Sequence, residues 1–84
     1  MNNTVQDRIK NVMSAVFELP VNQITDDSSP DTIGSWDSLK HINLVVALEE
    51  EFKVEFTDDD IVEMMNYPLI KEIVKSIVKW NLIY

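Results

Sequence analysis

Three stretches of this chain repeat apolar residues every three or four positions, the spacing that lines one face of an amphipathic helix. Pro20 ends the first pattern, and Pro68 fits the first turn of the last one. A chain of 84 residues has room for a single hydrophobic core. We therefore predict one domain over residues 1–84 with three longer helices. Their apolar positions are Val5, Ile9, Val12, Met13 and Val16, then Leu44, Leu48 and Phe52, and finally Ile70, Ile73, Val74 and Ile77.

A short fourth helix is predicted to begin at Thr57, because Thr57 and the three aspartates after it resemble a capping box. It must be short, since Pro68 restarts the chain soon afterwards. The long connection over residues 21–37 holds the only glycine, Gly34. The predicted fold is an all-α, small four-helix bundle of three longer helices and one short one, with a long loop between helices 1 and 2. The residues expected to pin this loop to the core are Leu19, Val21, Ile24 and Ile33.

Acidic residues outnumber basic ones by 15 to 7, which gives a formal net charge of -8. This charge repels nucleic acid and anionic membranes, so we expect partners with basic docking patches, no nucleic acid and no membrane insertion. The chain has no cysteine, which excludes disulfides and thiolate metal sites. The polar N-terminus is unlike a signal peptide, and no apolar run approaches membrane-spanning length. We predict a soluble, cytoplasmic monomer.

The segment before the middle helix places a serine at the helix start. Asp37 is a favourable N-cap, which puts Ser38 at the first helical position, where unpaired backbone N–H groups favour an anion. Gly34 gives the preceding backbone the freedom to turn and leave the hydroxyl accessible. Ordinary helix capping produces the same pattern, so these residues alone do not identify a function.

Two motifs at a fixed distance, GSWDSL at residues 34–39 and LVVALEEEF at residues 44–52, together resemble the attachment motif and second helix of acyl carrier proteins. The resemblance implies that Ser38 receives a covalent 4'-phosphopantetheine from coenzyme A, through a phosphopantetheinyl transferase, with Asp37 and Leu39 completing the motif. It implies a non-catalytic protein whose arm holds acyl groups as thioesters. Acyl-loading and acyl-transferring enzymes would then be its partners.

The resemblance also implies a partner surface along the middle helix, beside the arm. For Glu49 and Glu50, a hydrated helix end is an equally good explanation. The other apolar residues of the helix, Leu44, Leu48 and Phe52, are expected in the core. The residues expected at the partner surface are Trp36, Leu39, Ile42, Val46, Glu49 and Glu50.

Several positions depart from the pattern of housekeeping fatty-acid carriers. Lys40, His41 and Asn43 stand where those proteins tend to have acidic or small neutral residues, and Trp36 replaces a small residue. The acidic face therefore begins late in the helix. These departures favour a specialised carrier, for a polyketide, a modified lipid or a surface-polysaccharide precursor, at least as much as one for general fatty-acid synthesis.

Parts of the sequence also suggest functions other than an acyl carrier. A hydrolase built on Asp37, Ser38 and His41 lacks an elbow turn or oxyanion site, and His41 is expected to be exposed. The aspartates at 58–60 lack the ligand spacing of an EF-hand, so no metal site is predicted. A helical interaction module without an arm, or a peptidyl or D-alanyl carrier, would share most of these features. The apolar tail of Trp80, Leu82, Ile83 and Tyr84 fits either packing on the bundle or a contact surface.

Overall fold

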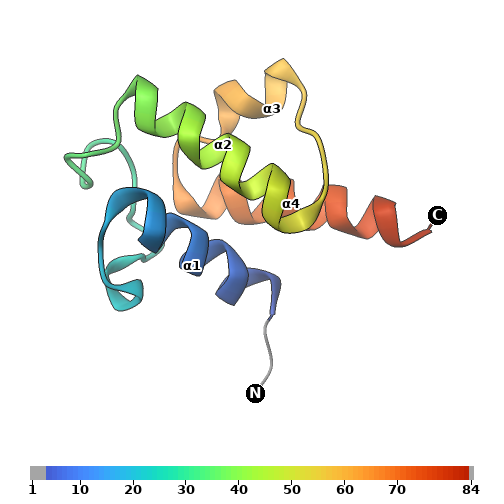
Figure 1. Cartoon of the computed structure of the whole chain (residues 1–84), viewed down its shortest axis with the longest axis horizontal. Helices are drawn as coiled ribbons and strands as arrows, with labels where there is room; N and C mark the ends of the chain where they lie inside the picture. Colours follow the sequence, from blue (N-terminus) through green and yellow to red (C-terminus); the bar gives the residue numbers. More distant parts are fainter. Residues whose placement is uncertain (1–3, 84) are drawn as a thin grey trace.

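The computed structural model describes residues 4–83, with side chains described for residues 4–78. Within this part the chain forms four α-helices, with one turn of 3-10 helix, η1 (Val21–Gln23), in the first connection (Figure 1). The predicted all-α fold, with three longer helices, one short helix and a long first connection, is confirmed. The helices are α1 (Val5–Phe17), α2 (Ser38–Phe52), α3 (Asp58–Glu63) and α4 (Tyr67–Ile83).

The helices enclose one core to which the long connection also contributes. Helix α1 packs against α2 and α4, and α3 packs against α4. Ile24 and Ile33 of the connection are buried as predicted, but Val21 is 42% exposed, so that part of the expectation was wrong. The buried apolar residues are Ile9, Met13, Phe17, Ile24, Ile33, Trp36, Leu44, Val45, Leu48, Val54, Phe56, Met64, Tyr67, Ile70 and Val74.

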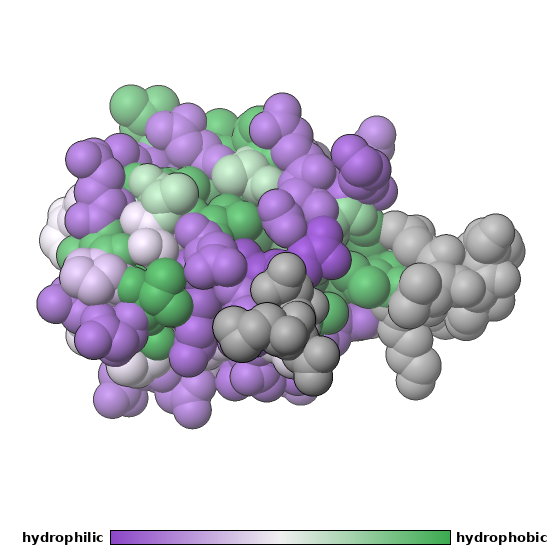
Figure 2. All heavy atoms as spheres, turned by 60° about the horizontal axis from the view of Figure 1, so that its bottom comes forward, coloured by the Kyte–Doolittle hydropathy of each residue, from purple (hydrophilic) through white to green (hydrophobic). Residues whose placement is uncertain are grey.

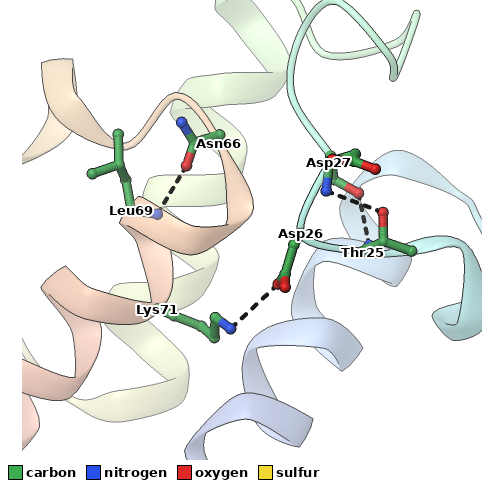
Figure 3. Close-up of polar contacts among 7 residues, drawn as sticks. Thr25, Asp26, Asp27, Asn66, Leu69 and Lys71 are labelled. Carbon is green, nitrogen blue, oxygen red and sulfur yellow. Dashed lines mark hydrogen bonds and ion pairs between the residues drawn. The ribbon is translucent and has the colours of Figure 1, made fainter.

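Each α-helix begins at a side chain that accepts a hydrogen bond from an otherwise unpaired backbone amide. The predicted capping box opens α3: Thr57 Oγ1 accepts from the Asp60 amide at 3.1 Å, and Asp60 Oδ2 accepts from the Thr57 amide at 3.1 Å. At the start of α4, Asn66 Oδ1 accepts from the Leu69 amide at 2.9 Å (Figure 3). The four capping residues are Thr4, Asp37, Thr57 and Asn66.

The connection is tied to the start of α4 by polar contacts. Ser28 is buried; its Oγ accepts from the Thr25 amide at 2.9 Å, and its carbonyl accepts from the Tyr67 amide at 3.0 Å. Lys71 reaches across from α4, with its Nζ 3.4 Å from Asp26 Oδ1 (Figure 3). These contacts hold a segment of irregular backbone in one place, and α2 starts from its end.

The far end of α2 is held by α1. Arg8 donates from Nε to Glu51 Oε2 at 2.7 Å and from Nη2 to the Glu51 carbonyl at 2.7 Å. Its guanidinium also lies 4.5 Å from the centre of the Phe52 ring. Phe52 is half-buried against the core, whereas Leu44 and Leu48 are fully buried, as expected for this stripe. Both ends of α2 are therefore fixed.

Hydrophilic residues cover most of the face in Figure 2, with hydrophobic residues in separate patches among them. Among the described residues, no helix combines the length and apolar character needed to cross a bilayer. The tail residues Trp80, Leu82 and Ile83 lie beyond the described side chains and Tyr84 beyond the described residues, so the prediction for them is not tested.

Candidate functional site

Ser38 is the first residue of α2 and is exposed, as the sequence predicted. The cap that creates this position is Asp37, whose backbone is extended and whose Oδ1 accepts from the Lys40 amide at 2.8 Å. The Asp37 carbonyl accepts from the His41 amide at 2.8 Å, which closes the first turn. The Ser38 hydroxyl thus stands at the positive end of a four-turn helix and is open to solvent.

Beside Ser38 lies an open apolar hollow of about 560 Å³ between α2 and α3. Its walls come from both helices and from the end of the long connection, and its volume is in the range of small-molecule sites. Asp37 and Ser38 stand at its polar edge, while aliphatic side chains form most of the remainder. The lining residues are Pro30, Trp36, Asp37, Ser38, His41, Ile42, Ile61, Val62 and Met65.

Trp36 is a wall of this hollow and a core residue, which corrects its predicted place at the partner surface. Its side chain is 4% exposed, and its ring centre lies 4.9 Å from that of Phe17. Burying an indole removes a large apolar area from water, but its N–H then needs an acceptor. His41 supplies one: Trp36 Nε1 donates to His41 Nδ1 at 3.1 Å. Sequence spacing gave no sign of this pair.

His41 is half-buried, so the expectation of an exposed histidine was also wrong. Its Nε2 lies 2.8 Å from the Ile61 carbonyl of α3, while Nδ1 accepts from Trp36. Neither ring nitrogen is free to accept a proton from Ser38, and the Asp37 carboxylate is engaged in capping. The hydrolase arrangement of these three residues therefore lacks its general base.

Exposed apolar side chains lie on α2 and on α3 with the turn that follows it, some of them lining the hollow. On α2, Leu39 is 70% exposed and Ile42 is 53% exposed, and Val46 continues the row one turn later. Across the hollow, Val62 and Met65 are exposed as well, and sequence reasoning did not select them. The available signal in the sequence was the cluster of apolar residues Ile61, Val62, Met64 and Met65, which is more than one face of so short a helix can bury. Exposed large apolar residues gathered in one place mark an interaction surface.

Glu49, predicted at the partner surface, and Lys40, a departure from the family pattern, both make hydrogen bonds within the protein. Glu49 Oε2 accepts from the Phe56 amide at 2.9 Å and so helps to cap the turn after α2, whereas Glu50 is exposed. Lys40 points away from Ser38 and donates to the Val16 carbonyl of α1 at 3.2 Å. Of these charged residues near α2, Glu50 is therefore the one whose side chain is exposed.

No group of three or more histidine, cysteine or carboxylate side chains within the described residues is arranged to hold a metal ion. Of the aspartates at 58–60, Asp60 is used in the capping box, and the other two are exposed. The calcium alternative therefore gains no support from the geometry.

Comparisons with known proteins point in the same direction as this geometry. The family model described as "Phosphopantetheine attachment site" matches residues 7–77. The chain is 36% identical over 58 residues to the acyl carrier protein of Buchnera aphidicola subsp. Schizaphis graminum, covering 69% of this chain and 73% of that protein. Its fold matches the solution structure of holo acyl carrier protein from Geobacter metallireducens with a TM-score of 0.84 and 26% identity, over 94% of this chain and 91% of that one.

The match to the family model and the match to a holo acyl carrier protein indicate that this protein has a covalent 4'-phosphopantetheine as its prosthetic group. The chain offers what such a group requires: an exposed hydroxyl at a helix start, which suits a phosphodiester, and an apolar hollow next to it. A family model that spans most of the chain, a related sequence and a shared fold lead to one assignment. The chain belongs to the phosphopantetheine-attachment family, as an acyl carrier protein.

Proposed function

We propose that Ser38 is the attachment point of the phosphopantetheine arm. The observation that carries this proposal is the exposed side chain at the first position of α2, on the rim of an apolar hollow. In the attachment step Ser38 Oγ attacks the pantetheine phosphate of coenzyme A and forms a phosphodiester, the pyrophosphate bond of coenzyme A breaks, the nucleotide half leaves, and the Ser38 proton is lost. Because His41 and Asp37 are both engaged, we assign removal of that proton to the transferase.

The chain's own residues would position the arm and not react with its cargo. The Asp37 cap orders the first turn of α2, so the helix dipole favours the phosphodiester anion at Ser38. The thiol of the arm supplies the thioester chemistry. The protein is then a non-catalytic carrier, and partner enzymes complete every acyl transfer.

The partner surface is proposed to be the apolar rim formed by α2 and α3, extended by acidic residues. Ile42 from α2 lines the same hollow as Val62 of α3 and Met65 of the turn that follows it, and Leu39 and Val46 are exposed on α2 on either side of Ile42 along the chain. The net charge of -8 favours partners with basic patches, among them the phosphopantetheinyl transferase and enzymes that load and transfer acyl groups.

We further propose a specialised carrier, used for a polyketide, a modified lipid or a surface-polysaccharide precursor and not for general fatty-acid synthesis. Lys40 is directed to α1 and His41 to Trp36 and Ile61, so neither contributes negative charge to the first turns of α2. The acidic part of the surface starts only near Glu50. If the loaded protein supports chain elongation by a general fatty-acid synthase as well as that system's own carrier does, this specialisation is wrong.

The attachment point is tested by intact-protein mass spectrometry after incubation with coenzyme A and a broad-specificity phosphopantetheinyl transferase. We expect wild type to gain one phosphopantetheine and Ser38→Ala to gain none. Ser35→Ala is the matched control, since Ser35 is also exposed and lies three residues earlier; it should be modified like wild type. Modification of Ser38→Ala would contradict the assignment. A folded wild type that no transferase modifies would favour the interaction module without an arm.

The cargo class is tested on the product of that reaction. Loading with acyl groups but not with amino acids supports an acyl carrier. Efficient loading with amino acids would instead favour a peptidyl or D-alanyl carrier.

A further inference from the structure

One imidazole links α2 to α3 beside Ser38. His41 lies in the first turn of α2, accepts from the Trp36 indole N–H at 3.1 Å and reaches the Ile61 carbonyl of α3 at 2.8 Å. A carbonyl can only accept, so Nε2 must carry the hydrogen and Nδ1 must be bare. The structure thus defines a neutral imidazole with its hydrogen on Nε2.

The Ile61 carbonyl has no other obvious partner in its own helix. It lies in the last turn of α3, where carbonyls lack an amide four residues further on. The amide that would reach it, that of Met65, donates instead to the Glu63 carbonyl at 2.8 Å. His41 therefore satisfies an orphan acceptor of α3 and an indole donor of the core with its two ring nitrogens.

Protonation would break this arrangement. A protonated imidazole is a donor at both nitrogens, so Nδ1–H would face the Trp36 indole N–H, donor against donor. Trp36 is buried, and its ring is held by its contact with Phe17, so its N–H stays directed at the imidazole. The first turn of α2 is also the positive end of the helix, which disfavours a cation there. Both effects push the charged ring out of its place.

The other charged groups around His41 do not offset these effects. Asp37 is the only other charged residue that lines the hollow, and its carboxylate accepts from the Lys40 amide. The ammonium of Lys40 is directed to the Val16 carbonyl and lies 3.9 Å from Glu18. Neither group of the loop or of α2 is therefore placed to replace the lost acceptor.

The carboxylates of α3 lie elsewhere. Asp60 and Glu63 line a separate hollow against α4, and Asp60 is also engaged in the capping box. Asp58 and Asp59 are exposed in the first turn of α3, while His41 binds the carbonyl of the fourth residue.

We propose that His41 is a positioning residue that holds α3 against the Ser38 end of α2 while its imidazole is neutral, and that protonation releases α3. Since Ile61, Val62 and Met65 line the hollow beside Ser38, this contact sets the position of the wall against which an arm would lie. The contact itself is independent of what Ser38 carries. Its bearing on the arm rests on the proposed attachment at Ser38.

The test uses the full, unmodified chain, so its result does not depend on attachment at Ser38. Nitrogen-15 NMR of the ring gives the tautomer, and amide hydrogen exchange at Ile61 and Met64 reports the opening of α3. Both amides are hydrogen-bonded, to the Thr57 and Asp60 carbonyls. Measurements run from about pH 8 to about pH 5, the range in which histidine ordinarily titrates. Exchange rates are corrected for the intrinsic effect of pH.

Two variants separate the chemistry of His41 from its bulk. His41→Gln keeps one donor and one acceptor but cannot titrate in this range, and His41→Phe keeps a ring without either. Because His41 is the only histidine, any pH effect that remains in His41→Gln must come from other groups, such as the terminal amine or the carboxylates.

We expect the Nε2–H tautomer in wild type, and protection of Ile61 and Met64 that falls roughly two- to tenfold on acidification, the range for loss of one hydrogen bond. In His41→Gln, protection of these two amides should not change on acidification. In His41→Phe, their protection should be as low at every pH as that of wild type at acid pH. A wild-type ring with its hydrogen on Nδ1, an unchanged protection at acid pH, or an equal acid response in His41→Gln would overturn the proposal. If His41→Phe does not fold, the other two proteins still decide.

Discussion

At the scale of single residues, Tyr67 combines a buried ring with a hydroxyl that has no hydrogen-bond partner among the described residues. The ammonium groups of Lys71 and Lys10 lie 4.8 and 5.6 Å from its ring centre. Burial raises the pKa of Tyr67 above 10.0, and the nearby carboxylates of Asp26 and Asp7 raise it further. An unpaired buried hydroxyl is costly, whereas the ring itself is not.

Tyr67→Phe should therefore raise the free energy of unfolding by up to about 1 kcal/mol at neutral pH, because it removes the unpaired group and keeps the ring. The pH dependence has a definite sign. A raised pKa means that the unfolded chain loses the proton first, so wild-type stability falls as pH rises above about 10. The free energy of unfolding of Tyr67→Phe should fall less steeply than that of wild type over this pH range. Urea denaturation of both proteins at neutral and alkaline pH measures both effects; a destabilised variant at neutral pH would contradict the first.

What the sequence predicted at this scale was local. Asp37 as a cap, Ser38 at the first helical position and Thr57 in a capping box each depend on residues within a few positions. Trp36 and His41 were placed wrongly because their partners come from elsewhere. One hydrogen bond of His41 reaches an acceptor 20 residues away on another helix, and no local pattern encodes it.

At the scale of elements, α3 is the weakest part of the site. Its six residues are too few to be stable as a helix alone, so it depends on its capping box, on packing against α4 and on the contact with His41. Its existence was predictable from the caps and from Pro68. The apolar hollow between α3 and α2 was not, because helix spacing gives the faces of two helices but not the distance between them.

Thr57→Ala should cost about 1 kcal/mol locally, since it removes one half of the capping box. The expected result is faster amide exchange at Ile61 and Met64, with a smaller change in thermal stability. Thr4→Ala is the matched control, because Thr4 caps α1 with the same chemistry far from the hollow along the chain. Equal loss of α3 protection in both variants would mean that α3 opens only with the whole domain.

At the scale of the whole molecule, a net negative charge is combined with an apolar rim on α2, α3 and the turn after α3. The charge of -8 attracts basic partners from a distance, and the rim supplies the contact itself. The composition and helix spacing were enough to predict the acidic bundle and the α2 half of this rim. The other half, Val62 of α3 and Met65 just after it, required the structure.

Ile42→Glu should leave the fold intact, because the side chain is largely exposed, and should lower kcat/KM of acyl transfer by partner enzymes about tenfold. Val21→Glu is the matched control: Val21 is also an exposed aliphatic residue but lies in η1, away from the rim. Steady-state kinetics and thermal unfolding distinguish the outcomes. A large loss of stability in Ile42→Glu would assign this residue to the core instead.

Because Arg8 holds Glu51 through two hydrogen bonds, the clasped end of α2 is a fixed point from which distances to the Ser38 end can be measured. The helix has 15 residues and so extends about 22 Å from Ser38 to the clasped end. The chain contains no cysteine, so Lys53→Cys, just beyond the clasp, would introduce its only protein thiol. A donor dye placed there before arm attachment would give a fixed reference point, and energy transfer to an acceptor dye on the acyl group would then report their separation as enzymes lengthen or remove that group.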